Sequence, residues 1–194
     1  STEDTGGRNV AVGYQTLLNQ NVDSYAYNIA VGYSAGKEIT TGTQNTIIGG
    51  LAGDALTTGM NNVAMGYSAL STEDTGNCNV AIGAHALEDL NYDGTAYNTA
   101  VGHAAGRDIT TGTENTFIGG LAGDALTTGL GNTALGAKAL STDTTGRYSV
   151  AIGHGALENQ AFTGNQEAYN VAVGYAAGND ITTGVQNTIV GGQA

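Results

Sequence analysis

The sequence predicts an all-β fold, a parallel β-solenoid whose short coils follow one another without interruption. The first observation is a five-residue box of the general form Asn-x-Ala-x-Gly, which occurs eleven times in the 194 residues. The second is its spacing, which is 17 residues in most coils. The third is composition: 32 glycines and no proline suit a chain that turns often and keeps its backbone N–H groups for a ladder. A fixed period of this kind indicates stacked coils.

The boxes are grouped in a longer repeat. Their spacings run 19, 17, 17, 17, then 19, 17, 17, 17, then 21 and 17, which makes a super-repeat of 70 residues and four coils. Residues 9–78 form one copy, 79–148 a second and 149–194 a partial third, while 1–8 match the end of a preceding copy. We therefore expect a single repeat domain over 1–194, cut from a longer chain. The boxes begin at Asn9, Asn28, Asn45, Asn62, Asn79, Asn98, Asn115, Asn132, Ser149, Asn170 and Asn187.

Each box is predicted to be a short strand that ends at a bend. Its second residue is Val, Ile or Thr and its fourth a large aliphatic, and this alternation is typical of a strand. A helix would lose about 1 kcal/mol at each glycine. The fifth residue is glycine in every box, and we expect these glycines to be structural: Gly13, Gly32, Gly49, Gly66, Gly83, Gly102, Gly119, Gly136, Gly153, Gly174 and Gly191.

A second arm follows the bend, and the 17-residue coils then end in Thr-Gly, where glycine is expected to supply a positive φ. The arm carries a large aliphatic at one of two places, either where Leu70 stands or, when that place is glycine, three residues later, as at Leu56. Each coil thus keeps the volume of one large aliphatic side chain while the position of that side chain in the coil changes, as a close-packed interior requires.

The sequence pattern indicates that the third box residue trades side-chain volume with the residue that follows the box glycine. Where the third is Ile47, Phe117 or Ile189, the later residue is glycine, and where it is Ala, the later residue is often aromatic. Sites that trade bulk are expected to be neighbours or to share a space. From this we infer that one strand face lines the interior and the other packs on another chain. The aromatic positions form a candidate surface-binding column that could stack on sugar rings: Tyr14, Tyr33, Tyr67, His103, His154 and Tyr175.

Composition excludes several classes of partner. The net charge is −12 and only five residues are Lys or Arg, which argues against nucleic acid. Cys78 is the only cysteine, so no intrachain disulfide can form. No apolar run is long enough to insert into a membrane.

The boxes NVAVG, NVAIG and NTAVG, followed by x-x-A-L or x-x-A-G and by T-T-G, resemble a known repeat. They are similar to the left-handed β-roll repeats of trimeric autotransporter adhesin heads, and more closely to repeats of phage tail fibres. The resemblance covers residues 9–194 and implies a left-handed roll and a homotrimer with its rolls side by side. The coils of 17 to 21 residues are longer than those of adhesin heads, and no part of residues 1–194 resembles a neck or coiled-coil stalk.

No residue pattern predicts catalysis, a cofactor or a metal, so we expect a protein that is not an enzyme. The GGLAGD strings at 49–54 and 119–124 are similar to a calcium-binding roll, but they occur only once per 70 residues. His103 and His154 lie three coils apart, too far to share a metal unless copies of His103 meet on a three-fold axis. The acid pairs Glu73-Asp74 and Glu88-Asp89 are expected to be solvated.

The leading functional hypothesis is a structural fibre or adhesin segment of a phage virion, involved in host attachment. It would be extracellular, would bind copies of itself, and could contact a host glycan or protein. The alternatives are the head of a bacterial trimeric surface adhesin, an ice- or mineral-binding solenoid using paired threonines such as Thr57-Thr58, and a tailspike hydrolase with acids brought together between chains.

Overall fold

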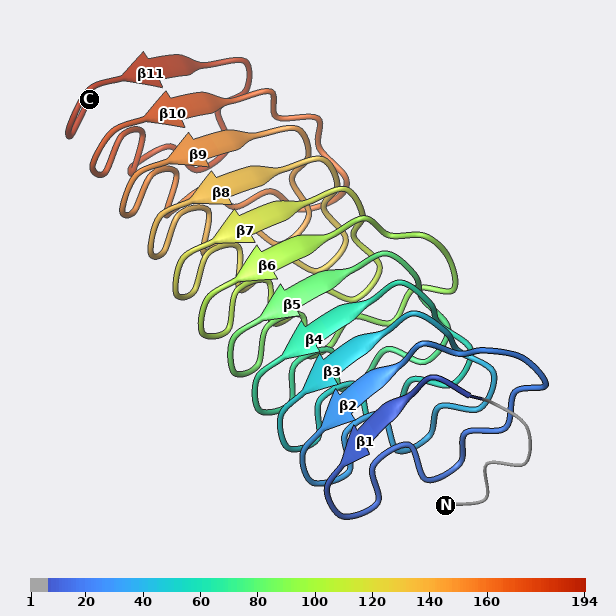
Figure 1. Cartoon of the computed structure of the whole chain (residues 1–194). Helices are drawn as coiled ribbons and strands as arrows, with labels where there is room; N and C mark the ends of the chain where they lie inside the picture. Colours follow the sequence, from blue (N-terminus) through green and yellow to red (C-terminus); the bar gives the residue numbers. More distant parts are fainter. Residues whose placement is uncertain (1–6) are drawn as a thin grey trace.

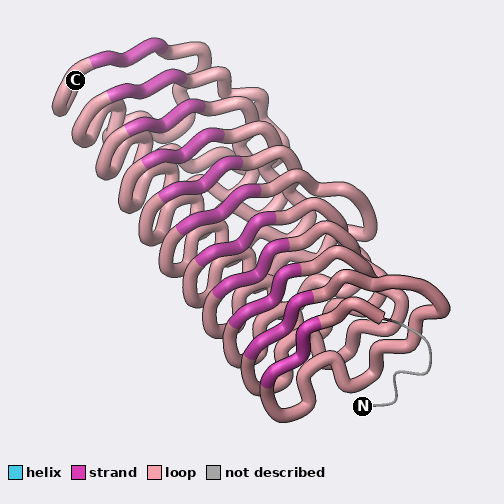
Figure 2. Tube along the Cα trace, viewed as in Figure 1, coloured by secondary structure: helices cyan, strands magenta, loops and turns pink. Residues whose placement is uncertain are grey.

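A computed structural model describes residues 7–194 and places all eleven boxes in one parallel sheet, in the order β1 to β11 (Figure 1). Each strand has three residues, and the remainder of each coil consists of turns and loops, with no helix in the described range (Figure 2). The predicted all-β solenoid is therefore confirmed. The strands are β1 Val10–Val12, β2 Ile29–Val31, β3 Thr46–Ile48, β4 Val63–Met65, β5 Val80–Ile82, β6 Thr99–Val101, β7 Thr116–Ile118, β8 Thr133–Leu135, β9 Val150–Ile152, β10 Val171–Val173 and β11 Thr188–Val190.

The register aligns every box with the next, residue for residue. Met65 on β4 pairs with Ile82 on β5, and Ile82 pairs with Val101 on β6, although the second step spans a longer coil. The extra residues of the longer coils form wider loops between β1 and β2, β5 and β6, and β9 and β10 (Figure 1). Insertions thus change the loops and leave the sheet intact.

The box glycines are required by two separate features of the bend. Gly83 has a φ of 137°, a region that L side chains rarely adopt. A Cβ on Gly83 would also lie 2.6 Å from the carbonyl carbon of Gly102 on the next coil. The sequence prediction of a bend at this glycine is confirmed, and the close stacking of coils explains why no other residue occurs there.

The Thr-Gly glycines have a different role from the one predicted. None of them has a positive φ. A Cβ on Gly112 would instead collide with the carbonyl oxygen of Gly129 and lie 2.7 Å from Cδ1 of Ile109. Positive φ occurs at the residue before each box, where Tyr97 (54°) and Cys78 (61°) stand. Glycine ends the coil because adjacent coils approach closely there, which a single-coil view of the sequence could not show.

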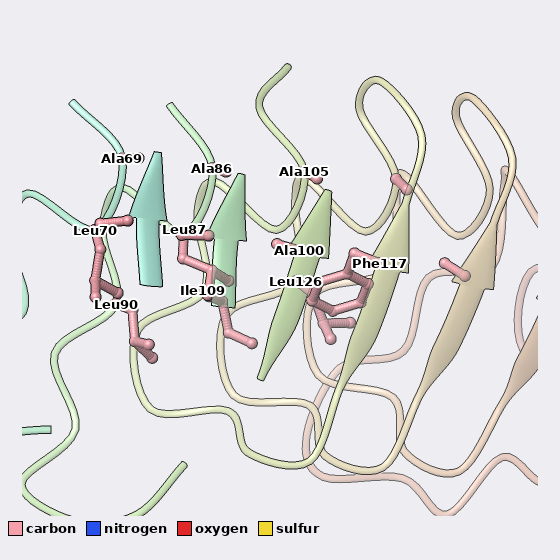
Figure 3. Packing of buried hydrophobic residues seen from close by; sticks show 14 of the residues in the cluster. Ala69, Leu70, Ala86, Leu87, Leu90, Ala100, Ala105, Ile109, Phe117 and Leu126 are labelled. Carbon is pink, nitrogen blue, oxygen red and sulfur yellow. The ribbon is translucent and has the colours of Figure 1, made fainter. Parts of the chain in front are cut away.

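The interior is a narrow column of small and aliphatic side chains. The third box residue points inward and is alanine in most coils, and the aliphatic groups of the second arm pack against it (Figure 3). Leu70 and Leu87 stand at the first expected place, and Ile109 and Leu126 at the second, all fully buried. The predicted switch of position at constant volume is confirmed.

The inferred trade of bulk across the box glycine is wrong. Phe117 is fully buried, whereas Gly120 is partly exposed on the outside of the coil. The space that Phe117 occupies is left by Gly106 and Gly123 on the second arm: a Cβ on Gly106 would lie 2.6 Å from Cδ2 of Phe117. The interior bulk is therefore compensated inside, and the glycine at 120 needs another explanation.

Candidate interaction surface

The outer face of the sheet is uncharged from end to end and largely apolar, with threonine at the second box position of five strands. The second and fourth box residues point outward, and no strand contains a charged residue. Their side chains are half-buried in most coils and exposed in several, among them Val12 (57%), Ile118 (38%) and Leu135 (42%). Large continuous apolar patches on a protein surface mark interaction sites.

The acidic residues lie away from this face. Of the seventeen Asp and Glu residues, Glu3 and Asp4 fall outside the described range, and the other fifteen all lie on the return part of a coil, nine or more residues after its box begins. Asp54 and Asp124 are partly buried there, and burial raises the pKa of both carboxyls. The molecule therefore has one apolar side and one acidic side.

The predicted Tyr and His column lies along one edge of the apolar face and is exposed. Tyr14, Tyr33, Tyr67 and Tyr175 are 55 to 66% exposed, and His103 and His154 are also exposed. Neighbouring rings stack where successive coils both carry one: Tyr14 and Tyr33 have centroids 5.7 Å apart, and His154 and Tyr175 have centroids 5.6 Å apart.

His85 joins this row, which the sequence pattern did not predict because His85 stands one position later in its coil. Its ring contacts Tyr67 at 5.5 Å and His103 at 6.0 Å between centroids. Its Nδ1 lies 2.9 Å from Oε2 of Glu88. A second aromatic row, at the residue before the box, was also missed. It contains Tyr27, Tyr97, Tyr148 and Tyr169, of which the last two stack at 5.3 Å.

The first box residue builds a ladder of buried asparagines, which no sequence argument had assigned. Oδ1 of Asn98 accepts the backbone N–H of Asn115 at 3.0 Å, and Nδ2 of Asn115 donates to the carbonyl of Gly129 at 2.9 Å. The same pattern continues at Asn132. The near-invariance of Asn in the boxes was the available signal, since a buried polar side chain is kept where it satisfies backbone groups.

The ladder has one substitution, Ser149, and the chain compensates for it. Gln160 enters the interior, accepts a hydrogen bond from Nδ2 of Asn170 at 2.7 Å, and donates one to Oδ2 of Asp143 at 2.7 Å. In the preceding super-repeat the corresponding residues are Asn79, Leu90 and Glu73.

The expectation that Glu73 is solvated is wrong. It is fully buried, and its carboxylate accepts backbone N–H groups from Gly76 at 2.7 Å, Tyr92 at 3.1 Å and Thr75 at 3.2 Å. Burial raises the pKa of Glu73, and these hydrogen bonds oppose that rise. Asp143 holds the corresponding place in the next super-repeat and is also fully buried. Both acids therefore stabilise a turn by accepting backbone hydrogen bonds, and their side chains are not accessible to a binding partner.

Other candidate features of the sequence take structural positions. The first hydroxyl of a Thr-Thr pair is used within the roll: Thr57 Oγ1 donates to the carbonyl of Asp74 at 2.9 Å, and Thr127 Oγ1 to that of Thr144 at 2.8 Å. In the GGLAGD string, Gly49 forms the bend and Gly53 leaves room for Ile47.

A hollow of about 580 Å³ lies over the last coil, beside Ile181 and Ile189.

Residues 7–194 contain no group of three or more His, Cys, Asp or Glu side chains placed to hold a metal ion. The same residues include no helix that could cross a membrane. Comparison with protein-family models, with curated proteins and with solved structures finds no match for this chain.

Proposed function

We propose that the chain is a structural segment of an elongated fibre, formed by copies of itself that pack along the outer face of the sheet. The observation that carries this proposal is the uncharged and largely apolar face of eleven strands, set against an acidic return side. Burying such a face removes apolar surface from water, while the acidic side stays solvated. Stacking at about 4.8 Å per strand makes the eleven coils roughly 50 Å long.

The proposal includes the left-handed side-by-side homotrimer that the repeat resemblance implies. It also places the fibre outside the cell, as a virion tail fibre or related appendage that takes part in host attachment. The bacterial surface adhesin remains the alternative. Antibodies against the chain should label thin appendages of purified virions, and labelling of the bacterial surface alone would favour the adhesin.

Sedimentation equilibrium at micromolar concentration tests the assembly. The expected mass is three times the 19.4 kDa of one chain. Met65→Lys together with Ile82→Lys places two charges on adjacent outward positions of β4 and β5 and should lower the mass to that of a monomer. Asn91→Lys, which adds a charge in an exposed loop, should leave the mass unchanged. A monomeric unsubstituted chain would refute the proposal.

A further inference from the structure

The exposed ring row has a gap at Gly50 that nothing within the chain explains. Gly50 lacks a positive φ, and an added Cβ would lie 3.7 Å from Cδ2 of Tyr67, which is ordinary contact. Gly120, its equivalent in the next super-repeat, also lacks a positive φ, and there the nearest atom would be 4.0 Å away. Gly49 and Gly119, directly before them, are constrained both by φ and by space. Glycine at 50 thus leaves an opening in the ring row that no contact or strain among residues 7–194 requires.

The rings on both sides of Gly50 are supported from behind. Tyr33 stacks on Tyr14 with an angle of 15° between the ring planes. Tyr67, on the far side of the gap, contacts the edge of His85. Both tyrosines are more than half exposed. The gap is therefore bounded by two rings whose outer neighbours restrict their movement.

The size of the gap suits one six-membered ring. Tyr33 and Tyr67 stand two coils apart, about 9.6 Å by strand spacing. A ring in contact with both would need about 3.5–4.0 Å on each side. This spacing has room for one ring and not for two.

We propose that Tyr33, Gly50 and Tyr67 form a binding site for one uncharged pyranose unit of a glycan. The apolar C–H faces of the sugar would stack on the two tyrosines, as apolar groups do on aromatic faces. None of the three residues is charged, and the net charge of −12 opposes anionic sugars. This inference deepens the proposed role in attachment and rests on it. The second super-repeat has His103 and Ala137 around Gly120, so it lacks the second ring and should bind more weakly.

Electrophoresis in native gels that contain dextran, mannan or galactan tests the site. The unsubstituted chain should be retarded by at least one of these neutral polysaccharides. Tyr33→Ala and Gly50→Leu should each raise the Kd at least about fivefold, through loss of stacking in the first case and filling of the gap in the second. Tyr97→Ala, which removes an exposed tyrosine from the other aromatic row, is the matched control and should retain binding, with Tm measured for every variant.

Three results would overturn the inference: no retardation of the unsubstituted chain by any of the polysaccharides, equal retardation of all variants, or a changed sedimentation mass for Gly50→Leu with unchanged binding. The last would assign Gly50 to contact between copies. The sedimentation mass of the unsubstituted chain tests the proposed assembly separately, so a failure of one can be told from a failure of the other.

Discussion

At the scale of single residues, the buried polar groups specify which coil stacks on which. In the 17-residue coils that end in Thr-Gly, the box asparagine satisfies a backbone N–H of the next coil and the carbonyl that closes its own coil, as Asn62 does with Asn79 and Gly76. A slipped coil would leave these groups unpaired in the interior, at about 1–3 kcal/mol each. The ladder therefore enforces the register that the small alanine core, by itself, would define weakly.

The ladder should tolerate a coordinated exchange better than a single change. Asn79→Ser removes the acceptor of the backbone N–H of Asn98 and should cost about 1–3 kcal/mol. Adding Leu90→Gln and Glu73→Asp reproduces the set found at Ser149, Gln160 and Asp143, and should recover part of the loss. Denaturant unfolding measures the coupling. Asn91→Ser, at an exposed asparagine, is the control. Equal losses for the single and triple variants would contradict the compensation.

Glu73 should give the fold a pH dependence of defined sign. Because burial raises its pKa, the contribution of this group is fully present below the unfolded pKa of about 4.3 and is lost as pH rises through the folded value. The stability of the unsubstituted chain relative to Glu73→Gln should therefore fall between pH 4 and pH 7. Unfolding free energies of both proteins at each pH provide the measurement. A relative stability that rises over this range would show a lowered pKa instead.

At the scale of the coil, the bend and the second arm decide which glycines can be replaced. The two glycines in Gly119-Gly120 look alike in the sequence, yet only Gly119 has a positive φ, 132°. Gly119 also lies against Gly136 of the next coil. Backbone strain and close packing thus require glycine at 119, whereas neither requires it at 120.

This contrast gives a matched pair of substitutions. Gly119→Ala should destabilise by at least about 3 kcal/mol, because backbone strain and a collision with the next coil add together. Gly120→Ala should stay within about 0.5 kcal/mol of the unsubstituted chain. Thermal unfolding at one protein concentration compares the two. Similar values for both variants would mean that the coils are further apart at the bend than described.

The aliphatic switch can be tested by converting one coil type into the other. Phe117→Ala should cost about 3–5 kcal/mol, since it leaves a cavity in the narrow core. Adding Gly123→Leu supplies the leucine that five of the eight coils with alanine in the box carry at this place, as at Leu140, and should recover part of that energy. Gly123→Leu alone should be harmful because it would collide with Phe117. If the stability lost in the double variant equals the sum of the losses in the two single variants, the proposed exchange between coil types is contradicted.

The period of the sequence predicted the strands, the bends and the alternating aliphatics, because each depends on residues close together in one coil. It did not predict contacts between coils. The Thr-Gly glycines, the partners of Phe117 and the burial of Glu73 all depend on what the next coil places against them. The exposed ring column was aligned correctly, but His85 was left out because it reaches the row from a different position of its coil.

At the scale of the whole molecule, the separation of apolar and acidic sides has an electrostatic cost. The fifteen carboxylates of residues 7–194 lie on the return side, where they repel one another. Raising sodium chloride from 0.01 to 0.15 M shortens the screening length from about 30 Å to about 8 Å, so the Tm should rise. Potassium chloride at equal ionic strength should raise the Tm by the same amount. A Tm that falls with salt would mean that attractive pairs dominate.

The residue-for-residue register also bears on how such a gene can change. Because β5 repeats the pairing of β1 and the longer loops recur with the same 70-residue spacing, a four-coil block removed or duplicated in frame would leave matching ends to be joined. The stretch GGLAGDALTTG occurs unchanged at 49–59 and 119–129, so the ends of such a block already match. Each block removed or added would change the length of the rod by about 19 Å by strand spacing, while its cross-section stays constant.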